Sequence, residues 1–351
     1  MSIKMSKGTV IIANPKSNSG LTGKNWDSIF QTISSFFENN IKVAFTEKEG
    51  DGTELARLYL KKDFKNIIPI GGDGTINEVA NGFFEDNNYA NYNIHEQSKD
   101  ANNNFLLSSS LKPINPEATM TILPSGTRNV LIQSLGLPND FEQCCKKLGN
   151  CKTSKRMDII YALVTNPDDP ETNVNRIFLN AAEIGIGAEI ISKSKDIRKK
   201  VNSRILSTIA GIATTLPTYK DKICEITIGV NKDSNIDDKI ITKMTMGIIA
   251  NGSFLGGNVQ AATKARVDDG LLDIIIIKNS EGISFLNEII NLKNGDQSKS
   301  EKEGNIYYTQ SKNVSMFSAE EKNIIVTLDG EPIGTLPGLF KVFPNYLKIR
   351  I

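Results

Sequence analysis

Apolar residues in the first third of the chain form short continuous runs, and between these runs they recur at helical spacing. Strands are predicted at 9–13, 42–46, 66–70 and 118–123, and helices at 25–39, 52–60, 75–81 and after 127 as far as Gly136. Strands that alternate with helices in this way predict a parallel sheet covered by helices. Gly82, which follows the helix at 75–81, is a residue type that favours the end of a helix.

After Lys155 the pattern changes to consecutive strand-like segments joined by polar loops. Strands are predicted at 157–164, 176–182, 223–230, 243–250, 272–278, 313–318 and 323–328. This succession predicts an antiparallel β domain. One stretch departs from it, because residues 203–215 carry apolar residues at helical spacing. We therefore expect an α/β half followed by a β-rich half, with a ligand-binding cleft between them.

The segment 87–110 differs in composition from its surroundings. Seven of the 18 residues from Asn87 to Asn104 are Asn, and three consecutive serines follow. We interpret it as a mobile surface insertion. His95, the only histidine of the chain, lies within it. Mechanisms that need a histidine base or a histidine-rich metal site are therefore disfavoured.

Charge and cysteine content narrow the functional class. The 41 Lys and Arg residues balance 40 Asp and Glu residues, which argues against a nucleic-acid-binding surface over the whole chain. The four cysteines form no CxxC motif, and this indicates a reducing cytosol rather than a disulfide framework. The clustered Cys144, Cys145 and Cys151 fall on a predicted helix and just after it, where we interpret them as ordinary thiols.

Neither a signal peptide nor a membrane span is predicted. The first apolar run is too short for a signal-peptide core, and no window approaches the roughly 20 apolar residues that cross a bilayer. We expect a soluble, cytoplasmic protein that could touch a membrane only at its surface.

A glycine-rich loop, Gly71–Glu78, follows one predicted strand and opens a helix. Its three glycines allow the backbone to turn sharply and to approach a phosphate closely, and the start of the helix offers free N–H groups. Asp73 would repel a phosphate unless Mg²⁺, or the water around it, lay between the two. The alternative is a tight turn in which Asp73 is the N-cap.

Two more polar loops, Pro124–Asn129 and Asn14–Gly20, also follow predicted strands. Together the three loops would lie at the carboxyl edge of one parallel sheet, where ligands bind in open α/β folds. Lys16 and Lys24 are further candidates for nucleotide binding, with ordinary turn chemistry as the alternative. The glycine-rich loop is neither a GxGxxG fingerprint nor a Walker A loop, which disfavours a NAD dehydrogenase and a P-loop ATPase.

At this point the residues resemble a known family. Gly71–Val79 with Asn81-Gly82 resembles the nucleotide loop of the diacylglycerol kinase catalytic-domain superfamily, which includes bacterial and archaeal lipid kinases and the sphingosine and ceramide kinases. Asn14-Pro15 with Gly20 is similar to its first motif, and Pro124–Asn129 to its third. Four more segments resemble other signatures of the family: Phe178–Ala188, Asn251–Gly257, Ala265–Asp273 and Leu328–Pro332.

The resemblance implies an α/β plus all-β fold. An N-terminal Rossmann-like domain with a parallel sheet would precede a C-terminal antiparallel β-sandwich, and the C-terminal segment would return to the first domain. The expected domains are residues 1–155 with about 335–351 for nucleotide binding, and 156–334 for the lipid substrate.

The resemblance also implies ATP and Mg²⁺ as cofactors. Together with the loops above, it predicts ATP-binding residues at Asn14, Thr46, Gly71, Gly72, Asp73, Gly74, Thr75, Ile76, Asn77, Glu78, Gly126, Thr127 and Asn129. Glu331 matches the general base of the family, and Asp73 would organise Mg²⁺. Asp269, with the backbone oxygens of Arg266 and Leu271, matches a structural magnesium site. The alternatives are a turn residue for Glu331 and solvated turn residues for Asp269 and Asp273.

Two positions depart from the family pattern. The glycine of the first motif, Gly20, is displaced by the residues that precede it, and Val130 follows Asn129 where the third motif usually has Asp or Ala. A polar role at position 130 is thereby excluded, which leaves the type of substrate open.

The predicted function is an ATP-dependent lipid kinase, active in lipid metabolism and phospholipid biosynthesis. In it, Glu331 accepts the proton of a lipid hydroxyl, as in a diacylglycerol or a sphingoid base, while the γ-phosphate is transferred. Two alternatives stay open: a NAD kinase-like enzyme, and a catalytically inactive nucleotide-binding module with a regulatory role. The oligomeric state is also open, a homodimer being one alternative.

The helical stretch 203–215 follows a basic run made by Lys193, Lys195, Arg198, Lys199, Lys200 and Arg204. Basic charge beside an apolar helix suits the surface of an anionic membrane. The alternative is a helix packed in the core and preceded by a solvated, charged loop.

Overall fold

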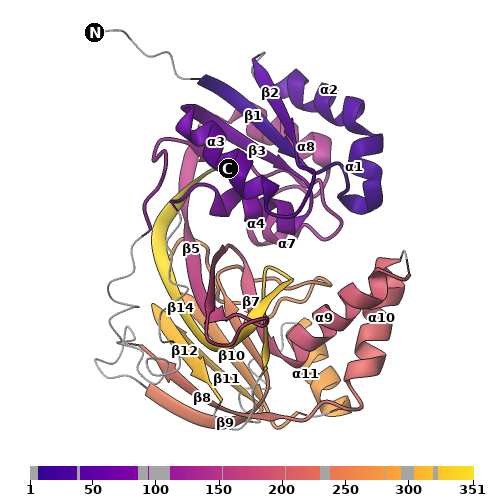
Figure 1. The fold of residues 1–351 in the computed structure, drawn as a ribbon, viewed down its shortest axis with the longest axis vertical. Helices are drawn as coiled ribbons and strands as arrows, with labels where there is room; N and C mark the ends of the chain where they lie inside the picture. The colour runs from indigo at the N-terminus through magenta and orange to yellow at the C-terminus, as the bar shows by residue number, and fades with distance from the viewer. Residues whose placement is uncertain are drawn as a thin grey trace. The chain divides into compact units, whose positions relative to one another are not determined.

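The chain divides into two compact units (Figure 1). The computed structural model describes residues 7–37, 40–85, 94, 111–151, 153–201, 203–229, 238–280, 282–293, 304–318 and 323–351. The first unit takes in the described residues up to 85, those from 111 to Ile159, and Pro344–Ile351, and the second unit takes in Ile160–Phe343. The insertion predicted at 87–110, with His95, lies outside the described residues apart from Ile94.

The first unit combines parallel strands with helices. Its strands are β1 (Lys7–Ala13), β2 (Ile41–Phe45), β3 (Phe64–Ile70) and β4 (Thr119–Met120). Its helices are the 3₁₀ helix η1 (Asn18–Gly20), α1 (Leu21–Lys24), α2 (Trp26–Phe36), α3 (Asp51–Lys61), α4 (Asp73–Asn81), α7 (Val130–Ser134) and α8 (Phe141–Asn150). The strands lie in the order β4–β3–β1–β2, and each neighbouring pair is parallel. The strand expected at 118–123 is wrong in length, because only two of its residues pair.

The continuous apolar runs of this unit form its core. Val10, Ile11 and Ile12 of β1 are fully buried, as are Ile67 and Ile68 of β3. Successive residues of a strand point to opposite faces of the sheet, so burial of consecutive residues means that both faces are covered. This is why the sequence shows unbroken apolar runs here rather than alternation.

Gly82 ends α4, but it does so with a right-handed φ of −70°. The left-handed conformation that favours glycine at helix ends is therefore not what this position requires. A Cβ atom at Gly82 would lie 2.5 Å from the Ala56 side chain and 2.5 Å from the Thr53 carbonyl oxygen. The glycine is explained by the close packing of α4 against α3.

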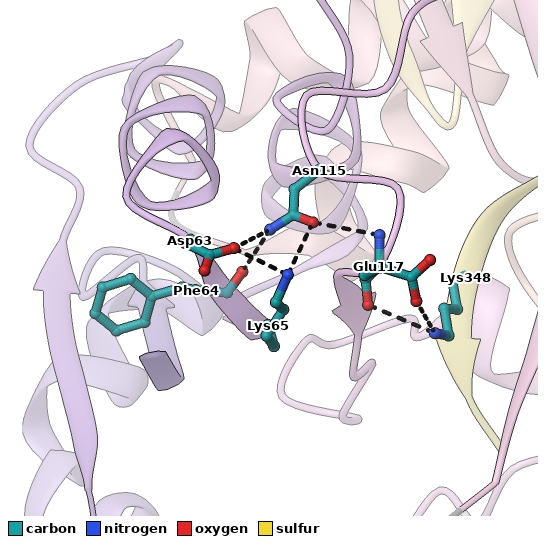
Figure 2. A network of polar contacts seen from close by, with 6 residues as sticks. All are labelled: Asp63, Phe64, Lys65, Asn115, Glu117 and Lys348. Atoms are coloured by element: carbon teal, nitrogen blue, oxygen red, sulfur yellow. Dashed lines mark hydrogen bonds and ion pairs between the residues drawn. The ribbon is translucent and has the colours of Figure 1, made fainter. Parts of the chain in front are cut away.

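The last residues of the chain belong to the first unit. Ile349 of β14 (Glu331–Arg350) pairs in parallel with Met120, and the Asn345 N–H donates to the Asp158 carboxylate at 2.6 Å. Figure 2 shows Lys348 beside Glu117, with 3.4 Å between the ammonium and a carboxylate oxygen.

The network in Figure 2 centres on Asn115, at the amino end of β3. Its amide donates to the Phe64 carbonyl and the Asp63 carboxylate, and its side-chain oxygen accepts from Lys65. Lys65 and Asp63 form an ion pair of 2.9 Å. The glycine-rich loop follows the carboxyl end of β3. This network therefore stabilises the end of the strand that is opposite to the loop.

The second unit is built mainly from antiparallel strands. These are β5 (Ser154–Thr165, which begins in the first unit), β6 (Asn173–Phe178), β7 (Ala181–Gly185), β8 (Lys222–Ile228), β9 (Asp238–Ala250), β10 (Leu272–Lys278), β11 (Ile306–Ser311), β12 (Asn313–Phe317), β13 (Ile325–Leu328) and most of β14. Every strand pairing described within this unit is antiparallel, among them β7–β9, β9–β10, β10–β11 and β13–β14. The predicted antiparallel β-rich half is confirmed.

Strand β10 shows why this unit has two apolar layers. Leu272, Ile274 and Ile276 belong to one buried cluster, together with apolar residues from other strands of this unit. Ile275 and Ile277 point the other way, into a second cluster that includes Ile186 and Phe285 from helices. The run of isoleucines thus reflects a strand that is buried on both faces.

Three expectations for this half are wrong. The single strand predicted at 176–182 is two strands, β6 and β7, separated by a turn at Leu179-Asn180. Residues 203–215 are not the only helix: α10 (Arg204–Thr215) is joined by α9 (Ile186–Arg198) and α11 (Ile283–Lys293). The basic run at 193–198 therefore lies on a helix rather than in a loop. Strand β11 was also not predicted from the pattern.

Within the described residues, no helix has the length and apolar character needed to cross a membrane.

Candidate functional site

In the first unit, the predicted nucleotide loops gather at one edge of the parallel strands. Asn14 follows β1, Thr46 follows β2 and Gly71 follows β3. The Asn14 N–H donates to the Ile70 carbonyl at 2.8 Å, and the Thr46 N–H donates to the Ala13 carbonyl at 2.9 Å. These backbone bonds continue the sheet pairing by one residue, so the loops begin side by side.

The glycine-rich loop lies directly against the loop at 124–129. The Gly71 N–H donates to the Ser125 hydroxyl oxygen at 2.7 Å, and that hydroxyl donates back to the Gly71 carbonyl at 2.9 Å. A Cβ atom at Gly126 would lie 2.8 Å from the Gly72 Cα. Only glycine fits at position 126, and the two loops together present a surface made of backbone.

Gly72 is different, because a Cβ atom built on it would meet nothing within 4 Å. Its φ of −84° suits any residue. Nothing within the protein therefore requires glycine at this position. A glycine with open space above it is what a closely approaching ligand would need.

Asp73 joins the beginnings of two helices. It is the first residue of α4, whose N-cap is Gly72, so the N-cap interpretation of Asp73 is wrong. Its Oδ1 accepts a hydrogen bond of 3.0 Å from the N–H of Val130, the first residue of α7. The half-buried carboxylate is thereby held at the point where both strand-to-helix loops end. Although Val130 has no polar side chain, its backbone supplies this contact.

The other predicted loop residues divide by burial. Thr75, Ile76 and Asn77 are buried, so these side chains face the protein. Asn14 donates to the Thr75 hydroxyl oxygen at 3.4 Å, which links the first loop to the glycine-rich loop. Thr127, by contrast, is exposed and donates to the Asn18 side chain at 3.1 Å.

Asn129 shapes the loop that carries Gly126. Its backbone is left-handed, with φ of 50°, and it is the N-cap of α7. Its side-chain oxygen accepts from the Gly126 N–H at 2.9 Å. A short polar side chain tolerates this conformation, because it replaces a missing backbone contact with its own hydrogen bond.

Glu78 makes contacts that the sequence did not suggest. One carboxylate oxygen accepts from the Gly50 N–H and the other from the Gly52 N–H, both at 3.0 Å. These donors lie at the start of α3, where backbone N–H groups have no partner within the helix. The geometry thus gives Glu78 a role in holding α3 against α4.

In the second unit, distant signature segments meet at one edge of the sheet. Asp329 directly follows β13, and its carboxylate accepts three hydrogen bonds of 2.9 to 3.2 Å from the N–H groups of Leu179, Asn180 and Ala181. The carbonyl of Asn180 accepts in turn from the N–H of Asn251. Segments that lie about 70 to 150 residues apart are therefore fixed to one another.

Glu331 leaves this edge through a tight turn. Asp329 and Gly330 have φ values of 49° and 78°, and Leu328 pairs with Glu331 across them. Two successive residues with positive φ are typical of a type I′ turn in a hairpin, and this turn favours glycine. The position of Glu331 is therefore fixed by the anchored carboxylate two residues before it.

Lys195 of α9 is a site residue that sequence reasoning missed. Its ammonium group forms an ion pair and hydrogen bond with the Glu331 carboxylate, and both side chains are partly exposed. In the sequence Lys195 is one of several basic residues in a run. The signal available was that α9 directly follows β7, and that Asp329 is held where β7 begins.

The candidate magnesium residues lie in the loop before β10. The Asp269 carboxylate accepts from the Leu271 N–H at 3.1 Å, and Arg266 pairs with Asp268 instead. Among the described residues, no three His, Cys, Asp or Glu side chains gather as metal ligands would. One carboxylate with two backbone carbonyls still fits Mg²⁺, since this ion takes oxygen donors and keeps several waters.

Asp273 lies close to this loop and is fully buried. Its carboxylate accepts hydrogen bonds from Tyr308 and Gln310. The pKa of Asp273 is raised to about 6, mainly by burial and also by nearby Asp269, although the two hydrogen bonds lower it. The sequence suggested a solvated turn residue here, and that alternative is wrong for Asp273.

The clustered cysteines are thiols, as expected. Cys144 and Cys145 are buried in α8, and burial raises their pKa values to about 11 and about 12. Cys151 follows the helix, and hydrogen bonds with Thr153 lower its pKa. A raised pKa keeps a thiol protonated and therefore unreactive.

Comparison with known proteins connects both units to one family. Residues 8–162 match the model of the diacylglycerol kinase catalytic domain, and residues 181–351 match the YegS C-terminal NAD kinase beta sandwich-like domain. The chain is 24% identical over 332 residues to the diacylglycerol kinase of Bacillus subtilis (strain 168). This alignment covers 94% of this chain and 91% of that protein. It is 25% identical over 347 residues to the diacylglycerol kinase of Staphylococcus saprophyticus, covering 98% and 95% of the two chains.

The fold is also similar to a solved structure. A crystal structure of a diacylglycerol kinase from Bacillus anthracis str. Sterne aligns with a TM-score of 0.62 and 20% sequence identity. The alignment covers 98% of this chain and 96% of that one. At this identity the likeness concerns the two-part fold alone.

Proposed function

The chain belongs to the diacylglycerol kinase catalytic-domain superfamily, and we propose that it is a lipid kinase that transfers the γ-phosphate of ATP to a lipid hydroxyl. Diacylglycerol is the favoured acceptor class because relatives that align along nearly the whole chain are named for it. A sphingoid base offers the same hydroxyl chemistry and stays open, because apolar pockets discriminate poorly among chains.

The proposal rests mainly on the backbone surface formed by Gly71, Gly72 and Gly126. Position 126 excludes any side chain, and position 72 has open space where a side chain could stand. Phosphate groups bind where no Cβ atoms block a close approach to the backbone and where a helix begins, as α4 does directly after Gly72. In this reaction the surface would hold the ATP phosphates, and Asn14, Thr46 and Thr127 would contact the nucleotide beside it.

Asp73 would help to hold the ion that balances the phosphate charge at this surface. When it is bound with ATP, Mg²⁺ neutralises the charge that develops on the phosphates. The half-buried Asp73 carboxylate is suited to orient the water around such an ion, because the Val130 N–H already fixes its direction. Asp269, with the carbonyls of Arg266 and Leu271, would hold a separate ion that stabilises the loop before β10.

Glu331 would serve as the general base. It takes the proton of the lipid hydroxyl while the hydroxyl oxygen bonds to the γ-phosphorus, and the bond to the bridging oxygen of ADP breaks. Lys195 contacts the same carboxylate, which supports a role in positioning Glu331. A base held by one ammonium group, and fixed in the chain by Asp329, would need no histidine.

The test is phosphate transfer from radiolabelled ATP to a total lipid extract, followed by identification of the labelled product. Glu331→Gln and Asp73→Asn should fold normally and lose activity by about 10² to 10⁴. Asparagine can still accept from the Val130 N–H, so the Asp73 variant tests charge rather than folding. Glu189→Gln and Asp51→Asn are controls for the loss of a carboxylate elsewhere. Full activity of Glu331→Gln would contradict the assignment of the base.

The same experiment separates the alternatives. A NAD kinase-like enzyme would label NAD and no lipid, so NAD is added in a parallel reaction. An inactive module would bind ATP, measured by calorimetry, and label neither acceptor. Omission of Mg²⁺ should abolish transfer in the wild type.

A further inference from the structure

Helix α10 packs on α9 through its small and polar residues. Ser207, Gly211 and Thr215, spaced four residues apart, are its buried positions among the side chains that the structure describes. A Cβ atom at Gly211 would lie 2.2 Å from the Ser194 hydroxyl oxygen of α9. The two helices therefore approach each other closely, and Figure 1 shows them side by side in the second unit.

Two large apolar side chains of α10 lie on the opposite side. Leu206 and Ile209 are each 58% exposed, and Ala213 is exposed as well. A surface helix of a globular protein normally turns its apolar stripe toward the core. Leu206 and Ile209 are instead largely exposed, so the core-packing interpretation of these two residues is wrong. Their position indicates a partner outside the unit.

Basic charge lies next to the amino end of the exposed apolar face. Lys199, Lys200 and Val201 are exposed in the connection between α9 and α10. Asp196 pairs with Lys199 at 2.8 Å, and no further Asp or Glu occurs in the sequence before Asp221. Exposed apolar residues flanked by predominantly positive charge complement an anionic surface that has an apolar layer beneath it.

We propose that the hairpin α9–α10 docks on an anionic phospholipid bilayer, with Leu206 and Ile209 at the acyl boundary and Lys199 and Lys200 on headgroup phosphates. This proposal rests on the proposed function, since a lipid kinase must reach an acceptor that resides in a bilayer. A second copy of the chain is the less favoured occupant, because it would present the same basic residues at α10 and no anionic surface to complement them.

The hairpin also connects to the proposed base. Lys195, which contacts Glu331, lies on α9, and α9 is the helix on which α10 packs. Docking of the hairpin would therefore place the Lys195–Glu331 pair near the membrane surface. The lipid hydroxyl lies at that surface as well, because it is the polar end of the acceptor.

Helix α11 supplies a matched control within the same unit. Its Ile283 and Ile290 are 76% and 53% exposed, but the only basic residue of the helix is Lys293 at its end. Leu206→Ser/Ile209→Ser and Ile283→Ser/Ile290→Ser remove similar apolar surface from two helices. Only the first pair removes it from a basic neighbourhood.

The experiment is flotation of the full chain with vesicles of phosphatidylcholine, with and without phosphatidylglycerol. We expect the wild type to float only with phosphatidylglycerol, and to be released by high salt. Leu206→Ser/Ile209→Ser and Lys199→Gln/Lys200→Gln should each lower the bound fraction about tenfold or more. The α11 variant should bind as the wild type does, as should Lys146→Gln/Lys147→Gln in the first unit.

Turnover of a dispersed short-chain diacylglycerol separates this proposal from the proposed function. The Leu206→Ser/Ile209→Ser variant should retain turnover of the dispersed acceptor and lose turnover of one embedded in vesicles. Absence of turnover in the wild type would count against the kinase assignment, while flotation would still test docking. Equal flotation of the wild type and the α10 variant would overturn the docking proposal. A dimer in solution that this variant dissociates would overturn it in favour of a second copy.

Discussion

The two candidate sites are built from different materials. In the first unit, the surface at Gly71, Gly72 and Gly126 is made of backbone, and it follows directly from the ends of parallel strands. In the second unit, the position of Glu331 depends on side chains from remote segments, namely Asp329 on the turn at Leu179-Asn180 and Lys195 on α9. One site is local in sequence, and the other exists only after long-range pairing.

This difference has consequences for what can disturb each site. A backbone surface is sensitive to the volume of a side chain, because a single Cβ atom can block it. A site held by carboxylates and an ammonium group is sensitive to charge and to pH. Substitutions of size and substitutions of charge should therefore affect the two units differently.

The largest difference should appear as a response to pH in the second unit. The pKa of Asp273 is raised to about 6 in the folded protein, mainly by burial, from an ordinary value near 4. The folded state thus binds a proton more readily than the unfolded state between about pH 4 and pH 6. The free energy of unfolding should fall as pH rises through this window, by up to about 3 kcal/mol. Asp273→Asn should remove that component.

The measurement is urea unfolding between pH 4 and pH 7, with a chelator present so that no bound ion contributes. Circular dichroism follows the whole chain, and fluorescence of Trp26, the only tryptophan, reports on the first unit. The difference between wild type and Asp273→Asn should appear in the circular dichroism signal and not in the fluorescence of Trp26. An unchanged pH profile in Asp273→Asn would contradict this origin of the pH response.

The next effect concerns the volume of a side chain in the first unit. Gly72→Ala adds a methyl group where nothing lies within 4 Å and where φ is −84°. Stability should be unchanged or slightly higher, since alanine restricts the unfolded chain. Binding of ATP should nevertheless weaken about a hundredfold, because the methyl group displaces the phosphates.

Gly126→Ala is the matched control for that prediction. Its Cβ atom would lie 2.8 Å from the Gly72 Cα and 2.9 Å from the Asn129 side-chain oxygen. This variant should lose about 1 to 3 kcal/mol of stability as well as ATP binding. Calorimetric ATP binding and thermal unfolding distinguish the two. If Gly72→Ala bound ATP as the wild type does, the backbone surface would not be the phosphate site.

A smaller effect should follow from the contact between Lys195 and Glu331. Lys195→Met should lower kcat about tenfold and leave the KM for ATP unchanged, because the residue acts on the base and not on the nucleotide. Lys195→Arg should restore most of the activity, since a guanidinium can replace the ammonium group. Lys193→Met, on the same helix, should have little effect. A parallel rise in the KM for ATP would contradict this role.

The comparison also explains what the sequence could predict. The glycine-rich loop was predictable because each strand, loop and helix is contiguous, and apolar runs such as Val10–Ala13 mark strands buried on both faces. The positions of Asp73 and Gly72 in the loop follow from the same local order. The partners of Asp73 and Glu78 were unpredictable, because the backbone N–H groups that these carboxylates accept from carry no side-chain signal.

The second unit was predicted less completely. Its strands could be predicted as a class, but the turn at Leu179-Asn180 divides one apolar segment into two strands. No local pattern marks this turn, because it is held by Asp329 from far along the chain. Lys195 was missed for the same reason, since its partner is 136 residues away. Helix α10 shows a further limit: periodicity predicts an amphipathic helix but not which face is covered.

The smallest predicted effect concerns Glu78, which the family resemblance places at the nucleotide. In the structure its two carboxylate oxygens accept from Gly50 and Gly52 at the start of α3. Glu78→Gln keeps one acceptor oxygen and loses the other, so about 1 kcal/mol of stability should be lost through the unsatisfied N–H group. ATP affinity should change little, because the carboxylate faces α3. If thermal unfolding were unaltered while ATP affinity fell tenfold, Glu78 would have to belong to the nucleotide site.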